Sequence, residues 1–327
     1  MMSTLFPLPP FDPKLAAIAT AGMPVAPMTP ELLETMRQQT GVGVAAIQAE
    51  LDRHDVTLNE VTIPGPGGDV ALAVIRPAAG AVNAPAIYNI HGGGMIMGDR
   101  YTNMAEYHLV EWVAKFGLVL VSVEYRLAPE AKDTEPVEDC YAGLRWVADN
   151  AEELGIDPAR IILAGASGGG GLAAGTALLA RDRKGPPLLA QALWCPQLED
   201  RGETVSALQV DAADTFSVWS RQHHRFAFAG LLGDDWESRT DVSIYASAFR
   251  AEDLSDLPPA FIDVGSSEVF RDAAVLYAMR LWQHGVQAEL HVWPGGFHGF
   301  DMFAPDIPVS VSSRRAQEDW VARILEQ

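Results

Sequence analysis

Residues 160–171 hold the side chain best suited to nucleophilic chemistry. The apolar run 161–164 leads into Gly-Ala-Ser-Gly-Gly at 165–169, and a helical stretch rich in small residues follows. A serine in a G-x-S-x-G motif between strand and helix is held on a tight turn that exposes its hydroxyl. The helix N-terminus behind it offers free N–H groups to a developing oxyanion. The pattern predicts acyl transfer through Ser167.

The main alternative for this segment is a phosphate-binding turn, because any glycine-rich strand-to-helix connection can present backbone N–H groups to an anion. The segment contains neither the G-x-G-x-x-G pattern nor a Walker lysine. The serine interpretation is therefore favoured.

A second glycine run follows an earlier apolar stretch. Residues 87–90 lead into His-Gly-Gly-Gly at 91–94. Consecutive glycines allow backbone N–H groups to turn towards a tetrahedral oxyanion. Alone, the run is compatible with a simple tight loop, but combined with the serine motif it indicates an acyl-transfer site.

A serine nucleophile of this kind needs an acid and then a histidine later in the chain. The chain has eight histidines, and of those later in the chain than Ser167 only His298 lies in a loop directly after a predicted strand. His291 falls inside that strand, whereas His223 and His224 belong to a stretch that reads as a surface helix. We therefore predict that His298 is the general base.

The acid is expected in the loop after the predicted strand 260–264. Glu268 is the first acidic residue after the strand, at a place where a carboxylate can fix the imidazole tautomer. Asp272 lies four residues further and is the second choice, and Asp263, inside the strand, is a poorer one.

The elements that would position these residues alternate between strand and helix from about residue 60. The predicted strands are 58–63, 70–76, 86–90, 118–124, 161–165, 191–195, 260–264 and 288–293, and the helical stretches are 101–116, 136–153, 169–182 and 269–285. Several strands are apolar almost throughout, as expected when both faces are covered. The alternation predicts an α/β fold with an eight-stranded, mostly parallel sheet and helices on both faces.

Two segments fall outside this alternation. Residues 1–55 become helical in pattern after a Pro-rich start, and residues 200–255 contain aromatic residues among charges but no clear strand. We expect these segments to form a helical cap over a core made of 56–199 and 256–327. A dimer surface is the competing interpretation of the insertion.

Composition excludes some classes of partner. The 23 Lys and Arg against 43 Asp and Glu give a net charge of −20, which argues against nucleic acid and anionic membrane surfaces. The N-terminus lacks the pattern of a signal peptide, and no apolar run could span a membrane. The two cysteines, Cys140 and Cys195, match neither a disulfide framework nor a metal-ligand spacing. We expect a cytoplasmic protein with both thiols buried.

Four separated blocks resemble the hormone-sensitive-lipase-like group of α/β-hydrolases, the bacterial family IV esterases. They are HGGG at 91–94, YRLAPE at 125–130 with VEDC at 137–140, the serine motif, and the PG…HGF stretch at 294–300. The resemblance covers about residues 60–305. It implies the α/β-hydrolase fold with a helical cap and hydrolysis of short-acyl carboxylic esters, with Ser167 as nucleophile and His298 as base.

The resemblance also implies an oxyanion hole made by the N–H groups of Gly93, Gly94 and Gly168. It requires no cofactor and no metal. Two departures stand out: Ala166 and Gly168 replace the family's usual Asp and Ala, and Glu268 replaces an Asp. Gly168 is expected to supply its N–H from a looser backbone.

The sequence leaves open other reactions at the same site, such as hydrolysis of lactones, amides or carbonates, because they share the acyl-enzyme. A non-catalytic binding protein on the same scaffold is the second alternative, although Ser, acid and His are all present. The partner expected is a small-molecule ester. A homodimer through the predicted edge strand 288–293 is also expected, because an uncovered edge invites pairing.

Overall fold

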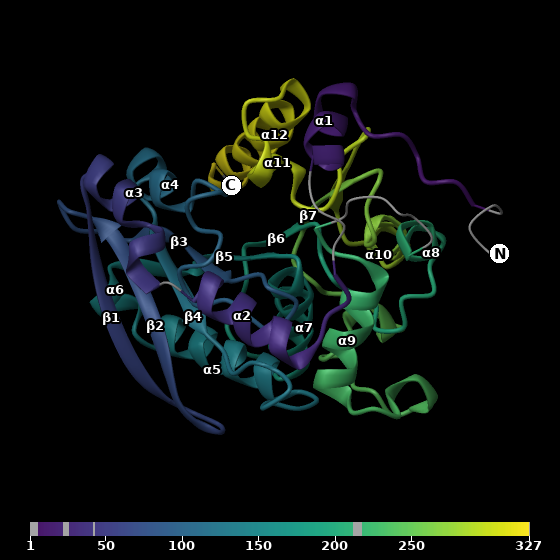
Figure 1. The fold of residues 1–327 in the computed structure, drawn as a ribbon. Coiled ribbons are helices and arrows are strands. Elements are labelled where there is room, and N and C mark those ends of the chain that lie inside the picture. Colours follow the sequence, from purple (N-terminus) through teal and green to yellow (C-terminus); the bar gives the residue numbers. More distant parts are fainter. Residues whose placement is uncertain (1–5, 22–25, 42, 212–217, 327) are drawn as a thin grey trace.

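Eight strands form one sheet through the centre of the protein (Figure 1). In this computed structural model, residues 6–21, 26–41, 43–211 and 218–326 are described. The strands are β1 (Val56–Gly65), β2 (Gly68–Pro77), β3 (Ala84–Ile90), β4 (Val119–Glu124), β5 (Ile156–Ala166), β6 (Ala190–Trp194), β7 (Ala260–Gly265) and β8 (Ala288–Trp293). Their spatial order is β1-β2-β4-β3-β5-β6-β7-β8. All eight predicted strands are confirmed.

Most of the sheet is parallel, as predicted. The pairs β1–β2 and β2–β4 are antiparallel, and every pair from β4 to β8 is parallel. Because the carboxyl ends of parallel strands lie at one edge of the sheet, the loops after β3, β5, β7 and β8 are brought together.

Helices cover both faces of the sheet. The helices are α1 (Pro13–Ala21), α2 (Pro30–Thr40), α3 (Gln48–Arg53), α4 (Leu109–Phe116), α5 (Glu135–Asp149), α6 (Ala151–Leu154), α7 (Gly168–Asp182), α8 (Val205–Asp211), α9 (Arg221–Leu232), α10 (Arg271–Gln283), α11 (Phe300–Phe303) and α12 (Pro308–Leu325). Short 3-10 turns are η1 (Gly43–Ala46), η2 (Trp236–Ser238) and η3 (Ala248–Arg250).

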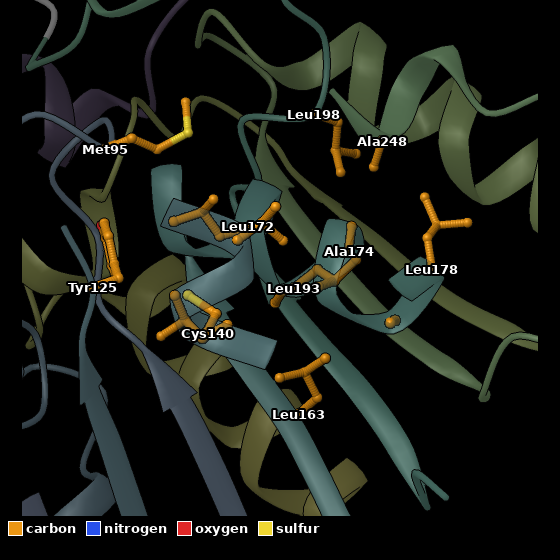
Figure 2. Close-up of a cluster of buried hydrophobic side chains, with 14 of the residues drawn as sticks. Met95, Tyr125, Cys140, Leu163, Leu172, Ala174, Leu178, Leu193, Leu198 and Ala248 are labelled. Carbon is orange, nitrogen blue, oxygen red and sulfur yellow. The ribbon is translucent and has the colours of Figure 1, made fainter. Parts of the chain in front are cut away.

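Side chains alternate between two hydrophobic clusters, one on each face of the sheet. On β5, Ile161 and Leu163 pack into the cluster that contains α5, α7 and α10, whereas Ile162 and Ala164 pack into the cluster with α4 and α12. Figure 2 shows part of the first cluster, including Leu163 of β5, Leu193 of β6 and Leu172 of α7. The two-sided burial explains why these strands are apolar throughout.

The helix predicted over 101–116 is only half present. Residues 101–108 form turns, and α4 begins at Leu109 after His108, whose φ of 55° is left-handed. The Asp99 carboxylate accepts a hydrogen bond from the Tyr101 N–H at 2.9 Å. This local bonding competes with the helical pattern. The helix α12 (Pro308–Leu325) was not among the helices predicted from the sequence.

The two segments expected to form a cap contact one another, although parts of them (residues 1–5, 22–25, 42 and 212–217) lie outside the described residues. Gln209 of α8 donates from Nε2 to the Pro7 carbonyl at 2.7 Å. On α9, His223 Nε2 lies 3.1 Å from the Ala26 carbonyl. Described residues of both segments therefore lie side by side.

Candidate active site

Ser167 stands on a strained turn between β5 and α7. Its φ of 54° and ψ of −120° are rare for a residue with a side chain. The turn is held by a hydrogen bond from the Ser167 N–H to the Trp194 carbonyl at 2.8 Å and by one from the Gln197 N–H to the Ser167 carbonyl at 2.9 Å. The sequence motif therefore adopts the strand–turn–helix context that it predicts.

Glycine is required at the turn because backbones approach closely there. A Cβ on Gly169 would overlap the carbonyl oxygens of Ile90 and His91 at the end of β3. The first turn of α7 is thus packed directly against the start of the 91–94 loop.

His298 lies between Ser167 and Glu268. Its Nε2 is 3.0 Å from the Ser167 hydroxyl, and its Nδ1 is 2.5 Å from Glu268 Oε2. In the arrangement a reaction needs, the serine hydroxyl donates to Nε2 and Nδ1–H donates to the carboxylate. His298 and Glu268 are 4% and 0% exposed, so the bond between them is shielded from water, whereas Ser167 on the other side of the ring is only partly buried.

The loops that carry the acid and the histidine are tied together. The Ser267 N–H donates to the Gly296 carbonyl at 2.9 Å, and the Gly295 N–H donates to the Ser266 hydroxyl at 2.7 Å. Phe270 packs edge-on to the His298 ring, with centroids 5.2 Å apart. The imidazole is therefore fixed from several sides.

Burial raises the pKa of the Glu268 carboxyl, and the adjacent His298 partly offsets this effect. Glu268 Oε1 has no hydrogen-bond partner among the described residues. The nearby imidazole is therefore the main group that favours the ionised carboxylate.

The carboxylates of the two other candidate acids accept hydrogen bonds from groups other than His298. Asp272 accepts hydrogen bonds from the Ser206 N–H at 2.7 Å and from Arg271 Nε at 2.7 Å, which links α10 to the start of α8. Asp263 accepts from Trp293 Nε1 at 3.2 Å and from Gln317 Nε2 at 2.9 Å. Of the three carboxylates, the structure brings Glu268 to the imidazole.

The 91–94 loop lies against the serine turn. Gly93 and Gly94 have φ values of 106° and 62°, and neither amide donates a hydrogen bond in the described part of the chain. Gly168 is the first residue of α7, where an N–H has no carbonyl one turn back. The three amides predicted to hold an oxyanion are thus available beside Ser167.

The expectation of a loose backbone at Gly168 does not hold. A Cβ there would lie 2.7 Å from Met95 N and 2.8 Å from Gly94 N and Cα. These are backbone atoms that cannot rotate away. The glycine is therefore explained by close packing of the two loops.

The sequence did not reveal a buried carboxyl pair behind the histidine loop. Asp263 and Asp301 share two donors of α12: Ser313 Oγ at 3.1 and 3.3 Å, and Gln317 Nε2 at 2.9 and 3.1 Å. Burial, together with the neighbouring Asp301, raises the pKa of Asp263 to about 7. In the sequence, this carboxyl pair was indicated only by the polar residues Ser313 and Gln317 on the face of α12 that is buried.

His223 and His224 are buried, at 2% and 1% exposure, and not on the helix surface as expected. The Ser220 N–H donates to His223 Nδ1 at 3.2 Å, so Nε2 carries the hydrogen towards the Ala26 carbonyl. His224 packs between Phe228 and Phe270, with ring centroids at 4.9 and 5.5 Å. Contacts with the N-terminal segment, for His223, and with Phe270 just before α10, for His224, help to bury the two rings.

Cys140 and Cys195 are both free and buried, as predicted. Over the described ranges, no group of three or more His, Cys, Asp and Glu side chains is arranged to hold a metal ion. Within the same ranges, no helix combines the length and apolar character needed to cross a membrane.

The fold and this site define an α/β-hydrolase. The chain belongs to the family described as alpha/beta hydrolase fold, which matches residues 87–302. The resemblance to the hormone-sensitive-lipase-like esterases is thereby confirmed at the level of the family.

Individual relatives include carboxylesterase NlhH of Mycobacterium tuberculosis, which is 37% identical over 255 residues, 75% of each chain. Esterase LipI of the same organism is 34% identical over 266 residues, 78% of each chain. Among solved structures, bacterial heroin esterase has a TM-score of 0.88 and 37% identity, covering 96% of this chain and 98% of that one. An esterase of Pyrobaculum calidifontis has a TM-score of 0.83 and 33% identity, covering 97% and 99%.

Proposed function

We propose that this protein is a serine carboxylesterase that hydrolyses short-chain carboxylic esters. The observation that carries the proposal is the continuous chain of hydrogen-bonding distances from Ser167 through His298 to Glu268, at 3.0 and 2.5 Å. The class of enzyme, a carboxylic ester hydrolase, is that of the carboxylesterase and esterase relatives in the same family.

In the first half-reaction, Ser167 attacks the ester carbonyl carbon while His298 Nε2 takes the hydroxyl proton. A C–O bond forms and the carbonyl oxygen becomes an oxyanion. His298 then returns the proton to the leaving alcohol as the ester C–O bond breaks. The acyl group remains on Ser167.

In the second half-reaction, water takes the place of the alcohol. His298 accepts a proton from the water, the new oxyanion forms, and the acid leaves as Ser167 recovers its proton. Glu268 keeps the Nδ1–H tautomer and stabilises the imidazolium that forms in each half.

The amides of Gly93, Gly94 and Gly168 are the proposed oxyanion hole. All three belong to backbone that is packed on the serine turn, so they need no rearrangement when charge develops. Donors fixed in advance are worth most in a site from which water is excluded.

The segments 1–55 and 200–255 are proposed as the cap that bounds the substrate pocket, with 56–199 and 256–327 as the catalytic core. The contacts of Gln209 with Pro7 and of His223 with Ala26 support the proposal that the two segments form one cap.

The proposal is tested with a fluorophosphonate probe and p-nitrophenyl butyrate. The probe should label the wild type but not Ser167→Ala, and Ser167→Ala or His298→Ala should lower kcat by about 10⁴- to 10⁶-fold. Ser312→Ala and His284→Ala are matched controls, since Ser312 lies on the exposed face of α12 and His284 is the residue that follows the last residue of α10. Near-normal turnover by Ser167→Ala would refute the proposal, and faster cleavage of a matched lactone or anilide would shift it to those substrates.

A homodimer through β8 is also proposed. β8 ends the sheet order, and beside it α10 exposes Leu276, Met279 and Trp282 at 42–45%. Trp282 Nε1 donates to the Ala288 carbonyl at 3.0 Å, which places this apolar stripe next to the edge strand. Exposed apolar side chains beside an open strand edge favour association with a second copy.

A further inference from the structure

One large aromatic side chain of the 200–255 segment reaches the proposed oxyanion hole. Trp219 precedes α9 and is 5% exposed. A Cβ added at Gly94 would overlap the six-membered part of the Trp219 indole. The ring is therefore in van der Waals contact with the loop that carries two of the three oxyanion amides.

The position of the indole is fixed by its surroundings. Ser220 caps α9, since its hydroxyl accepts from the His223 N–H at 3.3 Å while the Ser220 N–H donates back to the imidazole. The Trp219 and His223 rings lie 5.4 Å apart, and His223 is in turn anchored to the Ala26 carbonyl. The contact with Gly94 is thus held from both segments of the proposed cap.

The protonation of the leaving alcohol by His298 indicates which part of an ester lies against the indole of Trp219. The leaving alcohol must lie near His298 Nε2, which protonates it, so the acyl chain extends away from the histidine. On α9, the His298 side is occupied by His224, whose ring packs on Phe270. Trp219 contacts the oxyanion loop at Gly94, so its ring is assigned to the acyl side of the site.

We propose that Trp219 sets the upper size limit of the acyl group. The inference rests on the proposed esterase function and deepens it, because it gives a structural origin for a short-acyl preference. Methylene-sized changes in an apolar pocket alter kcat/KM by roughly 10- to 200-fold. Removing an indole should therefore move the chain-length optimum.

The test measures kcat/KM for p-nitrophenyl acetate, butyrate, hexanoate and octanoate, and for butyrate esters of alcohols of increasing size. Trp219→Ala should raise the octanoate-to-acetate ratio of kcat/KM by at least about 10-fold, and Trp219→Phe by less. The preference among alcohols should stay unchanged. Trp236→Ala is the matched control, because Trp236 is another buried tryptophan of this segment, 2% exposed, that packs on Phe228.

The outcomes separate the two proposals. An unchanged acyl profile in Trp219→Ala, an equal change in Trp236→Ala, or a change confined to the alcohol series would overturn the role of Trp219. Failure of the wild type to cleave any ester would instead remove the esterase function itself. If Trp219→Ala does not fold, as judged by circular dichroism, Trp219→Phe and Trp219→Leu supply the same comparison.

Discussion

The backbone of Gly168 touches the backbone of Gly94, so closely that a methyl group on Gly168 would stand 2.8 Å from the Gly94 nitrogen. The two residues belong to the two segments that supply the proposed oxyanion hole, the 91–94 loop and the serine turn. Their contact means that the positions of the donors depend on each other, and that neither loop can shift without the other.

Gly168→Ala should therefore lower kcat, because the added methyl pushes the 91–94 loop away from the serine turn. We expect a loss of about 10²- to 10³-fold, the size found when one oxyanion donor is removed. Gly230→Ala is the control, since its Cβ would have no neighbour closer than 3.7 Å. Normal kcat in Gly168→Ala, measured with a short p-nitrophenyl ester, would show that the loop tolerates the methyl.

Glu268→Gln should reduce kcat by several orders of magnitude, because an amide neither stabilises the imidazolium nor enforces the tautomer; about 10⁴-fold is known for a triad acid. Asp272→Asn should leave kcat close to wild type while lowering the melting temperature, because its carboxylate holds the start of α8. The two variants are compared by steady-state kinetics and thermal unfolding. The reverse pattern would assign the acid to Asp272.

Asp263→Asn should change the pH dependence of stability. Burial raises the pKa of Asp263 to about 7, so between pH 4 and 7 the folded protein keeps a proton that the unfolded chain releases. The free energy of unfolding then falls as pH rises through this range, by at most about 1.4 kcal/mol per pH unit. The uncharged Asn removes this contribution.

The melting temperature of Asp263→Asn relative to wild type should accordingly rise from pH 4 to pH 7 and level off above it. Unfolding scans at pH 4.5, 6 and 8 measure this directly. A difference that stays constant across these values would mean that Asp263 is ionised throughout.

The wild type should elute with the mass of two chains, and the double variant Leu276→Glu/Met279→Glu with that of one. Charges placed on the apolar stripe would be buried without partners in the dimer. Val82→Glu, at a position 92% exposed in the turn before β3, is the control. Light scattering of the wild type at the mass of one chain would contradict the dimer.

Much of the fold followed from local patterns. The strands alternate with helices and are apolar where both faces are covered, so their number and the parallel arrangement could be read from the chain. The serine turn was also predictable, because the spacing of Gly165, Ser167 and Gly169 reflects close contacts that admit no side chain. His298 was found by its place after a strand.

Other features depend on contacts between distant residues. Residues 101–108 have a helical pattern, yet turns form there around the Asp99 carboxylate. The buried face of α12 is partly polar because Ser313 and Gln317 serve Asp263 and Asp301, which only the folded chain brings near. The contact of Trp219 with Gly94 joins residues 125 positions apart, and no periodicity encodes it.

The left-handed backbone of Ser167 also has a consequence for evolution. A non-glycine residue in such a conformation costs on the order of 1–3 kcal/mol, a sizeable share of the stability of a typical domain. A glycine would relieve this strain and abolish the nucleophile. At residue 167, stability therefore favours glycine whereas catalysis requires serine. The hydrophobic clusters on both faces of the sheet supply the stability that offsets the strain of the serine.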